Sequence, residues 1–201
     1  MLYTSESDRQ SLLNLARQAV AEVVISGQTL AEIPVSGIFS RQLGVFISLH
    51  VDKRLRGCIG VVEPDVPLGD SVIRCASTAA RHDPRFPAMR AEELSNLQIE
   101  ISLLSPPCAV RPDQIEIGTH GLLISRGLQR GLLLPQVAVK HGLSAEQFLA
   151  ETCRKAQLSP DVWREPGTSL FAFTCEIFAS DGRSLEGASS RNPLKLQEKA
   201  R

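Results

Sequence analysis

The sequence has few aromatic residues, no net charge and no long apolar run. Aromatic residues make up 4% of the chain, so the core must be largely aliphatic and no base-stacking surface is indicated. Basic and acidic residues number 22 each, so the chain lacks the positive charge typical of proteins that bind nucleic acid or membranes. No run approaches the roughly 18 apolar residues of a membrane span. We therefore expect neither a nucleic-acid nor a membrane partner.

Common cofactor and metal motifs are also missing. The five cysteines form no Cys-x-x-Cys pair, the four histidines lack paired ligand spacing, and neither GxxxxGK[ST] nor GxGxxG occurs. We therefore expect no metal and no cofactor. The start, MLYTSESDRQ, lacks the basic and apolar regions of a signal peptide. Together with an odd number of cysteines, this favours a cytoplasmic protein with reduced thiols.

Hydrophobic spacing predicts the elements of the first half. Apolar residues at helical spacing predict a helix over 8–25, with Ser7 and Gln10 as a capping box. The segment GVFISLHVDKRLRGCIGVVEP predicts a β-hairpin with strands Val45–His50 and Arg54–Val61. The other elements predicted here are a helix from about Asp70 to Arg81, a short helix near 88–95 and an alternating strand over 97–105.

The second half resembles the first. GLLISRGLQRGLLLPQVAV (121–139) matches GVFISLHVDKRLRGCIGVV (44–62), and a helix and an alternating strand follow both. Pseudo-repeats over about 40–106 and 117–180 are one interpretation; the other is that any two hairpin–helix–strand units look alike. We predict one domain over 1–186 and a flexible polar tail over 187–201.

Several residues of the second half receive a structural interpretation. Ser144 and Gln147 are predicted to cap its helix, and a short helix is predicted to start at Ser159-Pro160. The last strand is predicted over 170–178, with Phe171, Phe173, Cys175 and Ile177 facing inward. The cysteines interpreted as packing residues on apolar faces are Cys75, Cys153 and Cys175.

The segment LRGCIG (55–60) is the first candidate site. Gly57 and Gly60 permit close approach of a ligand or a second backbone. In an extended strand Ile59 faces the core, while Arg56 and Cys58 share the opposite face, where a guanidinium favours a reactive thiolate. The alternative is that Cys58 is an inert core residue.

The segment RHDPRFP (81–87) is the second candidate. His82 can act as a base near neutral pH, with Asp83 and Arg85 beside it. Equally, Asp83-Pro84 can be a plain helix stop, with Phe86 as a core anchor and Arg85 in a surface ion pair.

The segment LPQV (134–137) is the third candidate. Under the duplication, Gln136 lies in the strand equivalent to that of Cys58. As a polar residue in an apolar run it needs a hydrogen-bond partner, which is a substrate amide or carboxylate, or merely a backbone group at a sheet edge.

Five blocks in order carry a resemblance: LRGCIG, DPRFP, IEISLLSPP, LPQV and the stretch from Cys153 to Trp163. The chain resembles the AMMECR domain family over about residues 8–180. The resemblance implies an α+β fold with two β/α repeats that share one barrel-like antiparallel sheet, with helices packed outside. The chain departs from the family pattern after DPRFP, where Ala88-Met89 replaces the usual Pro and Leu.

The resemblance also implies partners and a site. Prokaryotic members, called AmmeMemoRadiSam system protein A, are often encoded with a Memo-like protein and a radical SAM enzyme, and their activity is not established. The family's usual candidate site is the LRGCIG block. It implies roles for Arg56, Gly57, Cys58 and Gly60; the site residues that it implies more weakly are Asp83, Arg85, Phe86 and Gln136.

Two functions remain open. As an enzyme, the chain would use Cys58 as nucleophile or redox thiol, activated by Arg56, with His82 or Asp83 moving protons and Gln136 or backbone amides holding an oxyanion. As a binding module, it would hold a small anionic ligand, a peptide end or a partner's loop on the same face, through Arg56 or Arg85. We favour the binding module, because a reactive thiol needs more supporting chemistry, above all a general base, than the sequence displays.

Overall fold

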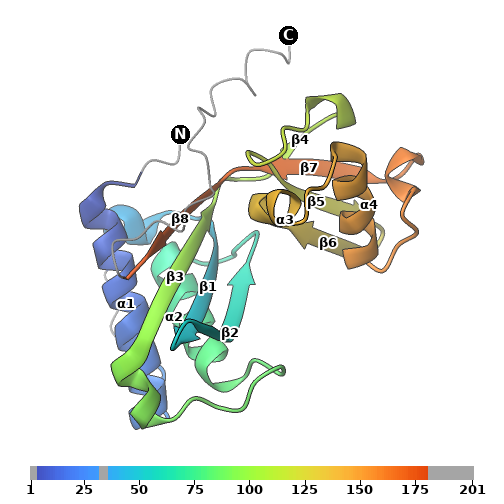
Figure 1. Cartoon of the computed structure of the whole chain (residues 1–201). Coiled ribbons are helices and arrows are strands. Elements are labelled where there is room, and N and C mark those ends of the chain that lie inside the picture. The colour runs from blue at the N-terminus through green and yellow to red at the C-terminus, as the bar shows by residue number, and fades with distance from the viewer. Residues whose placement is uncertain (1–3, 32–35, 181–201) are drawn as a thin grey trace. The chain divides into compact units, whose positions relative to one another are not determined.

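The computed structural model describes residues 4–31 and 36–180, and these form two compact units (Figure 1). The larger unit contains the described residues up to Leu104 together with those from Glu176 onward, and the smaller unit spans Ser105–Cys175. The fold combines helices with antiparallel strands, in agreement with the predicted α+β class. The predicted tail over 187–201 lies outside the described residues, and the predicted duplication stays a prediction.

The larger unit is a four-stranded sheet with two helices on one face. The sheet order is β2-β1-β3-β8, so the hairpin strand β2 forms one edge. The elements of this unit are α1 (Glu6–Ile25), η1 (Gly37–Ser40), β1 (Gly44–Val51), β2 (Arg54–Val61), α2 (Leu68–Arg81), η2 (Ala91–Asn96), β3 (Leu97–Leu104) and β8 (Cys175–Ala179). The predicted first helix, hairpin, second helix and third strand are confirmed, with small shifts at their ends.

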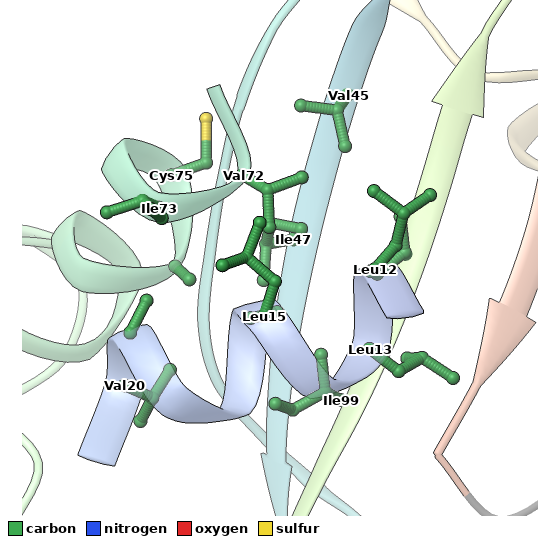
Figure 2. Close-up of a cluster of buried hydrophobic side chains, with 14 of the residues drawn as sticks. Leu12, Leu13, Leu15, Val20, Val45, Ile47, Val72, Ile73, Cys75 and Ile99 are labelled. Atoms are coloured by element: carbon green, nitrogen blue, oxygen red, sulfur yellow. The ribbon is translucent and has the colours of Figure 1, made fainter. Parts of the chain in front are cut away.

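One aliphatic core joins α1 and α2 to the sheet (Figure 2). Alternate residues of β1 and β3, such as Ile47 and Ile99, are fully buried against Leu12 of α1 and Val72 of α2. Cys75 is buried in the same core, and burial raises the pKa of its thiol to about 11. Cys75 is therefore a packing residue, as predicted.

The start of α1 differs from the prediction. Ser5 is the N-cap: it accepts a hydrogen bond from the backbone of Asp8, whose carboxylate accepts one from the Ser5 backbone. The predicted capping box of Ser7 and Gln10 is wrong. Just before the cap, Thr4 donates a hydrogen bond of 2.6 Å to Glu176 of β8. This contact fixes the chain next to Ser5, so the helix begins at Glu6, two residues before the predicted start.

The smaller unit has its own sheet and its own core. The sheet order is β4-β7-β5-β6, and Phe148 and Cys153 of α4 are fully buried against it. The predicted cap of α4 by Ser144 and Gln147 is confirmed. The elements of this unit are β4 (Cys108–Ala109), η3 (Pro112–Gln114), β5 (Gly121–Arg126), β6 (Gln129–Leu133), α3 (Pro135–Lys140), α4 (Ala145–Lys155), η4 (Val162–Arg164) and β7 (Ser169–Phe173).

The prediction of a single shared, barrel-like sheet is wrong for the described residues. Their strands make two four-stranded sheets, and neither sheet pairs its two edge strands with each other. The predicted strand 170–178 is two strands, because the backbone of Thr174 exchanges hydrogen bonds with Ser105 instead of continuing the ladder with β5.

The break at Thr174 also changes which residues of β8 face inward. Phe178 is buried in the core of the larger unit, whereas Ile177 and Cys175 are half-buried. The prediction that Ile177 faces inward is wrong, because the alternation restarts after the break. Among the helices of the described residues, none combines the length and apolarity needed to cross a membrane.

Candidate functional site

Strand β2 carries the LRGCIG segment, and it contains a β-bulge. Gly57 lies opposite Leu49 of β1, but the next residue of β1 lies opposite Leu55, so Arg56 is the extra residue. A bulge interrupts the alternation of side chains along a strand. The prediction of a regular strand is therefore wrong at this point, because the pairing of β2 with β1 is interrupted at Arg56.

The side chain of Arg56 binds the segment that follows α2. Its guanidinium makes two hydrogen bonds to the Glu93 carboxylate, of 2.6 and 3.0 Å, and donates to the carbonyl oxygens of Pro87 and Ala88 at 2.8 and 3.3 Å. The Arg56 guanidinium holds the pKa of Glu93 below its usual range. A guanidinium bound on both sides in this way is a structural tie between β2 and the loop.

Asp83 binds the outer edge of β2. Its side chain is only 2% exposed, and Oδ2 accepts a hydrogen bond of 2.9 Å from the backbone N–H of Cys58. Oδ1 accepts from the backbone N–H of Arg85 at 3.1 Å. Because β2 is an edge strand, the Cys58 N–H has no strand partner on that side, and Asp83 supplies one.

Arg85 completes this contact with the strand. It donates to both Asp83 oxygens, at 2.9 and 2.7 Å, and to the carbonyl oxygen of Cys58 at 3.0 Å. Its guanidinium lies 5.4 Å from the ring centre of Phe86. The Asp83 carboxylate, and to a lesser extent Cys58, raise the pKa of Arg85. Of the two arginines, Arg85 is therefore the one that contacts Cys58, through its carbonyl oxygen, whereas Arg56 is held by Glu93.

Cys58 faces away from the helices, on the other side of the sheet from the core. Its Sγ accepts a hydrogen bond of 3.3 Å from the Ser48 hydroxyl, directly opposite on β1. We call this side the polar face; the register of β1, β2 and β3 places on it Phe46, Ser48, His50, Cys58, Gly60, Gln98, Glu100 and Ser102.

Gly60 is required by its neighbour on the polar face. It lies opposite Phe46, and a Cβ built on Gly60 would collide with the Phe46 ring. The ring therefore covers the backbone of Gly60. Here the close approach that the sequence suggested is made by an aromatic ring of the protein itself.

Two further predicted residues lie on other elements. His82 ends α2 as its C-cap and is exposed. Gln136 lies in α3 of the smaller unit, not in a strand, because Pro135 occupies the first turn of a helix, where a missing N–H costs nothing. The prediction that Gln136 belongs to the strand equivalent to that of Cys58 is wrong. Its Oε1 is buried and has no hydrogen-bond partner among the described residues.

Sequence reasoning missed Ser48, Glu93 and Glu100 as members of the site. In the alternating strand over 97–105, Glu100 falls between Ile99 and Ile101, which face the core, so it lies on the opposite face. Its position opposite Ser48 depends on strand register, which a single sequence does not display. The pairing of Arg56 with Glu93 spans 37 residues and carries no local signal.

Chemically, the cluster offers a half-buried thiol beside a hydroxyl and a paired guanidinium. Within the described residues, no imidazole or carboxylate hydrogen-bonds the Cys58 thiol. In that same part of the chain, no group of three or more His, Cys, Asp and Glu side chains is placed to hold a metal ion.

Comparison with known proteins agrees with the blocks quoted from the sequence. The AMMECR1 family model matches residues 13–178. A protein of Methanothermobacter thermautotrophicus is 41% identical over 187 residues, covering 89% of this chain and 97% of the relative. A protein of Pyrococcus furiosus is 40% identical over 197 residues, covering 91% of this chain and 92% of the relative.

A solved structure is also similar. The crystal structure of an uncharacterised protein from Pyrococcus horikoshii has a TM-score of 0.77 and 40% sequence identity, covering 84% of this chain and 89% of that chain. Both the family model and these relatives cover most of the chain, including the strand, loop and helix that build the site. The chain belongs to the AMMECR1 family.

Proposed function

We propose that this protein is a binding or accessory module that acts through the LRGCIG strand and the polar face beside it. The observation that carries this proposal is that both backbone polar groups of Cys58 are bound by side chains. Its N–H donates to Asp83, and its carbonyl oxygen accepts a hydrogen bond from Arg85. Such contacts fix the shape of a surface before any ligand arrives. A nucleophilic site would instead pair the thiol with a base, whereas the hydrogen bond to the Cys58 thiol within the described residues comes from the Ser48 hydroxyl.

The partners that we propose are a Memo-like protein and a radical SAM enzyme, acting together with this chain in the cytoplasm. The support is the family resemblance, since such proteins are often encoded beside prokaryotic members. A small anionic ligand or a peptide is a weaker proposal. Arg56 and Arg85, which would receive it, each already bind a carboxylate, so an anion would have to compete with an intramolecular partner.

The test is binding between purified proteins. The chain is mixed with the Memo-like protein and with the radical SAM enzyme of the same genome, and binding is followed by size-exclusion chromatography and biolayer interferometry. We expect a complex with at least one of them. Cys58→Ala should retain it, whereas the longer side chain in Cys58→Met should weaken it about tenfold by obstructing the face.

The matched control is Cys108→Met, which makes the same change at an exposed cysteine of the smaller unit. Thermal melting of each variant verifies that it is folded. The proposal fails if neither partner binds at micromolar concentration, or if Cys58→Met binds as tightly as the unchanged protein.

A thiol-dependent enzyme is the second candidate, favoured by the Ser48 hydroxyl on Sγ and by the nearby Arg85. If the chain is a binding module, iodoacetamide should modify half-buried Cys58 more slowly than exposed Cys108 throughout the neutral pH range. Peptide mass spectrometry measures both rates in one sample. Faster modification of Cys58 at neutral pH, abolished by Arg85→Ala, would favour the enzyme instead.

A further inference from the structure

The charges around the polar face do not balance. Arg56 is paired with Glu93, and Arg85 with Asp83, so neither guanidinium leaves a net positive charge. Glu100 is half-buried, yet it has no ion pair and no side-chain hydrogen bond within the described part of the chain. Among the described side chains of the polar face, the charge without a partner is therefore the negative charge of Glu100.

Glu100 stands in one row with the thiol. Ser48 is the direct partner of Cys58 on β2 and of Glu100 on β3, so the three side chains lie side by side on the polar face. Directly opposed residues of neighbouring strands have Cβ atoms about 4.5–5.5 Å apart. The carboxylate is therefore roughly two strand spacings from the thiol, about 10 Å.

Within residues 4–31 and 36–180, no cationic side chain forms an ion pair with Glu100. His50, one row further along β1, is half-buried, and burial lowers its pKa, which favours its neutral form. Burial likewise raises the pKa of Glu100, as expected for a carboxyl that loses water without gaining a cation. The row on the other side contains Phe46, whose ring offers an apolar surface that also attracts cations.

We propose that the polar face receives a positively charged side chain of a partner protein, a lysine ammonium or an arginine guanidinium, and that Glu100 is its counterion. This inference rests on the proposed binding function and specifies the chemistry of what is bound. The sign is opposite to that of the anionic ligand suggested by the arginines in the sequence. The ring of Phe46 would contact the aliphatic carbons of the bound group that lie next to its positive charge.

The test uses the thiol as a reporter of the charge beside it. Cys58 is treated at pH 8 with two methanethiosulfonates, one bearing a trimethylammonium group and the other a sulfonate. In each case the thiolate attacks the sulfenyl sulfur, forms a mixed disulfide and releases methanesulfinate. The rate ratio at Cys58 is divided by the same ratio at exposed Cys108, measured in the same sample by mass spectrometry.

We expect the normalised ratio to favour the cationic reagent about tenfold in the unchanged protein. In Glu100→Gln it should fall to within about twofold of unity, whereas Glu100→Asp, which keeps the charge, should preserve the preference. Glu92→Gln removes an exposed carboxylate of the same unit and should change nothing. Thermal melting confirms that each variant is folded.

A ratio that is the same with and without the Glu100 charge would overturn the inference, as would a preference for the sulfonate reagent. No partner protein takes part in this measurement. Its failure would therefore leave the binding proposal standing with a ligand of different charge, and failure of the partner experiment would leave the charge of the site as measured.

Discussion

Replacing Asp83 by alanine is expected to lower the free energy of unfolding by about 3 kcal/mol. The carboxylate is almost fully buried and accepts hydrogen bonds from the Cys58 and Arg85 backbones and from the Arg85 side chain. Its loss leaves the Cys58 N–H at the edge of β2 without an acceptor and frees Arg85 from the strand. Urea unfolding at neutral pH measures the difference.

The same carboxylate predicts a pH dependence. Hydrogen bonds from Arg85 hold the pKa of Asp83 well below its usual range. A carboxyl whose folded pKa is depressed contributes stability that is complete above its unfolded pKa, about 4, and is lost as the pH falls toward the folded value. The stability difference between the unchanged protein and Asp83→Asn should therefore shrink as the pH falls from 5 toward 2.

A matched control is Asp65→Ala. Asp65 forms an ion pair with Arg74 at 3.8 Å, and its side chain is 87% exposed, so its removal should have little effect. Unchanged stability in Asp83→Ala would mean that water replaces the carboxylate at the β2 edge, and that the Asp83–Arg85 pair does not hold the strand.

Periodicity in the sequence predicted an element well where all its apolar residues pack against a single core. The first helix, the hairpin and strand 97–105 each have a buried apolar face that repeats at the spacing of a helix or a strand. The break at Thr174 could not be predicted in this way. An alternating pattern gives the two faces of a strand but not its neighbours, so β7 and β8 looked like one strand shared by one sheet.

The site shows the same limit. The LRGCIG and DPRFP segments were both singled out, and the structure joins them through Asp83, Arg85 and the backbone of Cys58. The bulge at Arg56 inserts a single residue and has no compositional signal, and the pairing of Arg56 with Glu93 has no local signal either. Glu100 was visible as a polar residue of a strand, but its lack of a counterion among the described residues is a property of the folded sheet.

Replacing Gly57 by alanine is expected to be the most damaging small substitution in β2. A Cβ at Gly57 would overlap the backbone carbonyl of Ala79 in α2, and no side-chain rotation can relieve a collision with backbone. Strand and helix would have to separate, which loosens the core between them. We expect a loss of roughly 3 kcal/mol or more in the free energy of unfolding, measured with urea.

Gly27→Ala is a suitable control, because Gly27 has a positive φ of 76° but nothing within 4 Å of a built Cβ. Its expected cost is about 1 kcal/mol, from backbone strain alone. Because Asp83 follows α2 directly, a displaced helix would also pull Asp83 from the Cys58 N–H and expose the thiol. Gly57→Ala should therefore increase the alkylation rate of Cys58 relative to Cys108, whereas Gly27→Ala should not. Stability equal to that of Gly27→Ala would show that β2 and α2 are not packed backbone to backbone at this point.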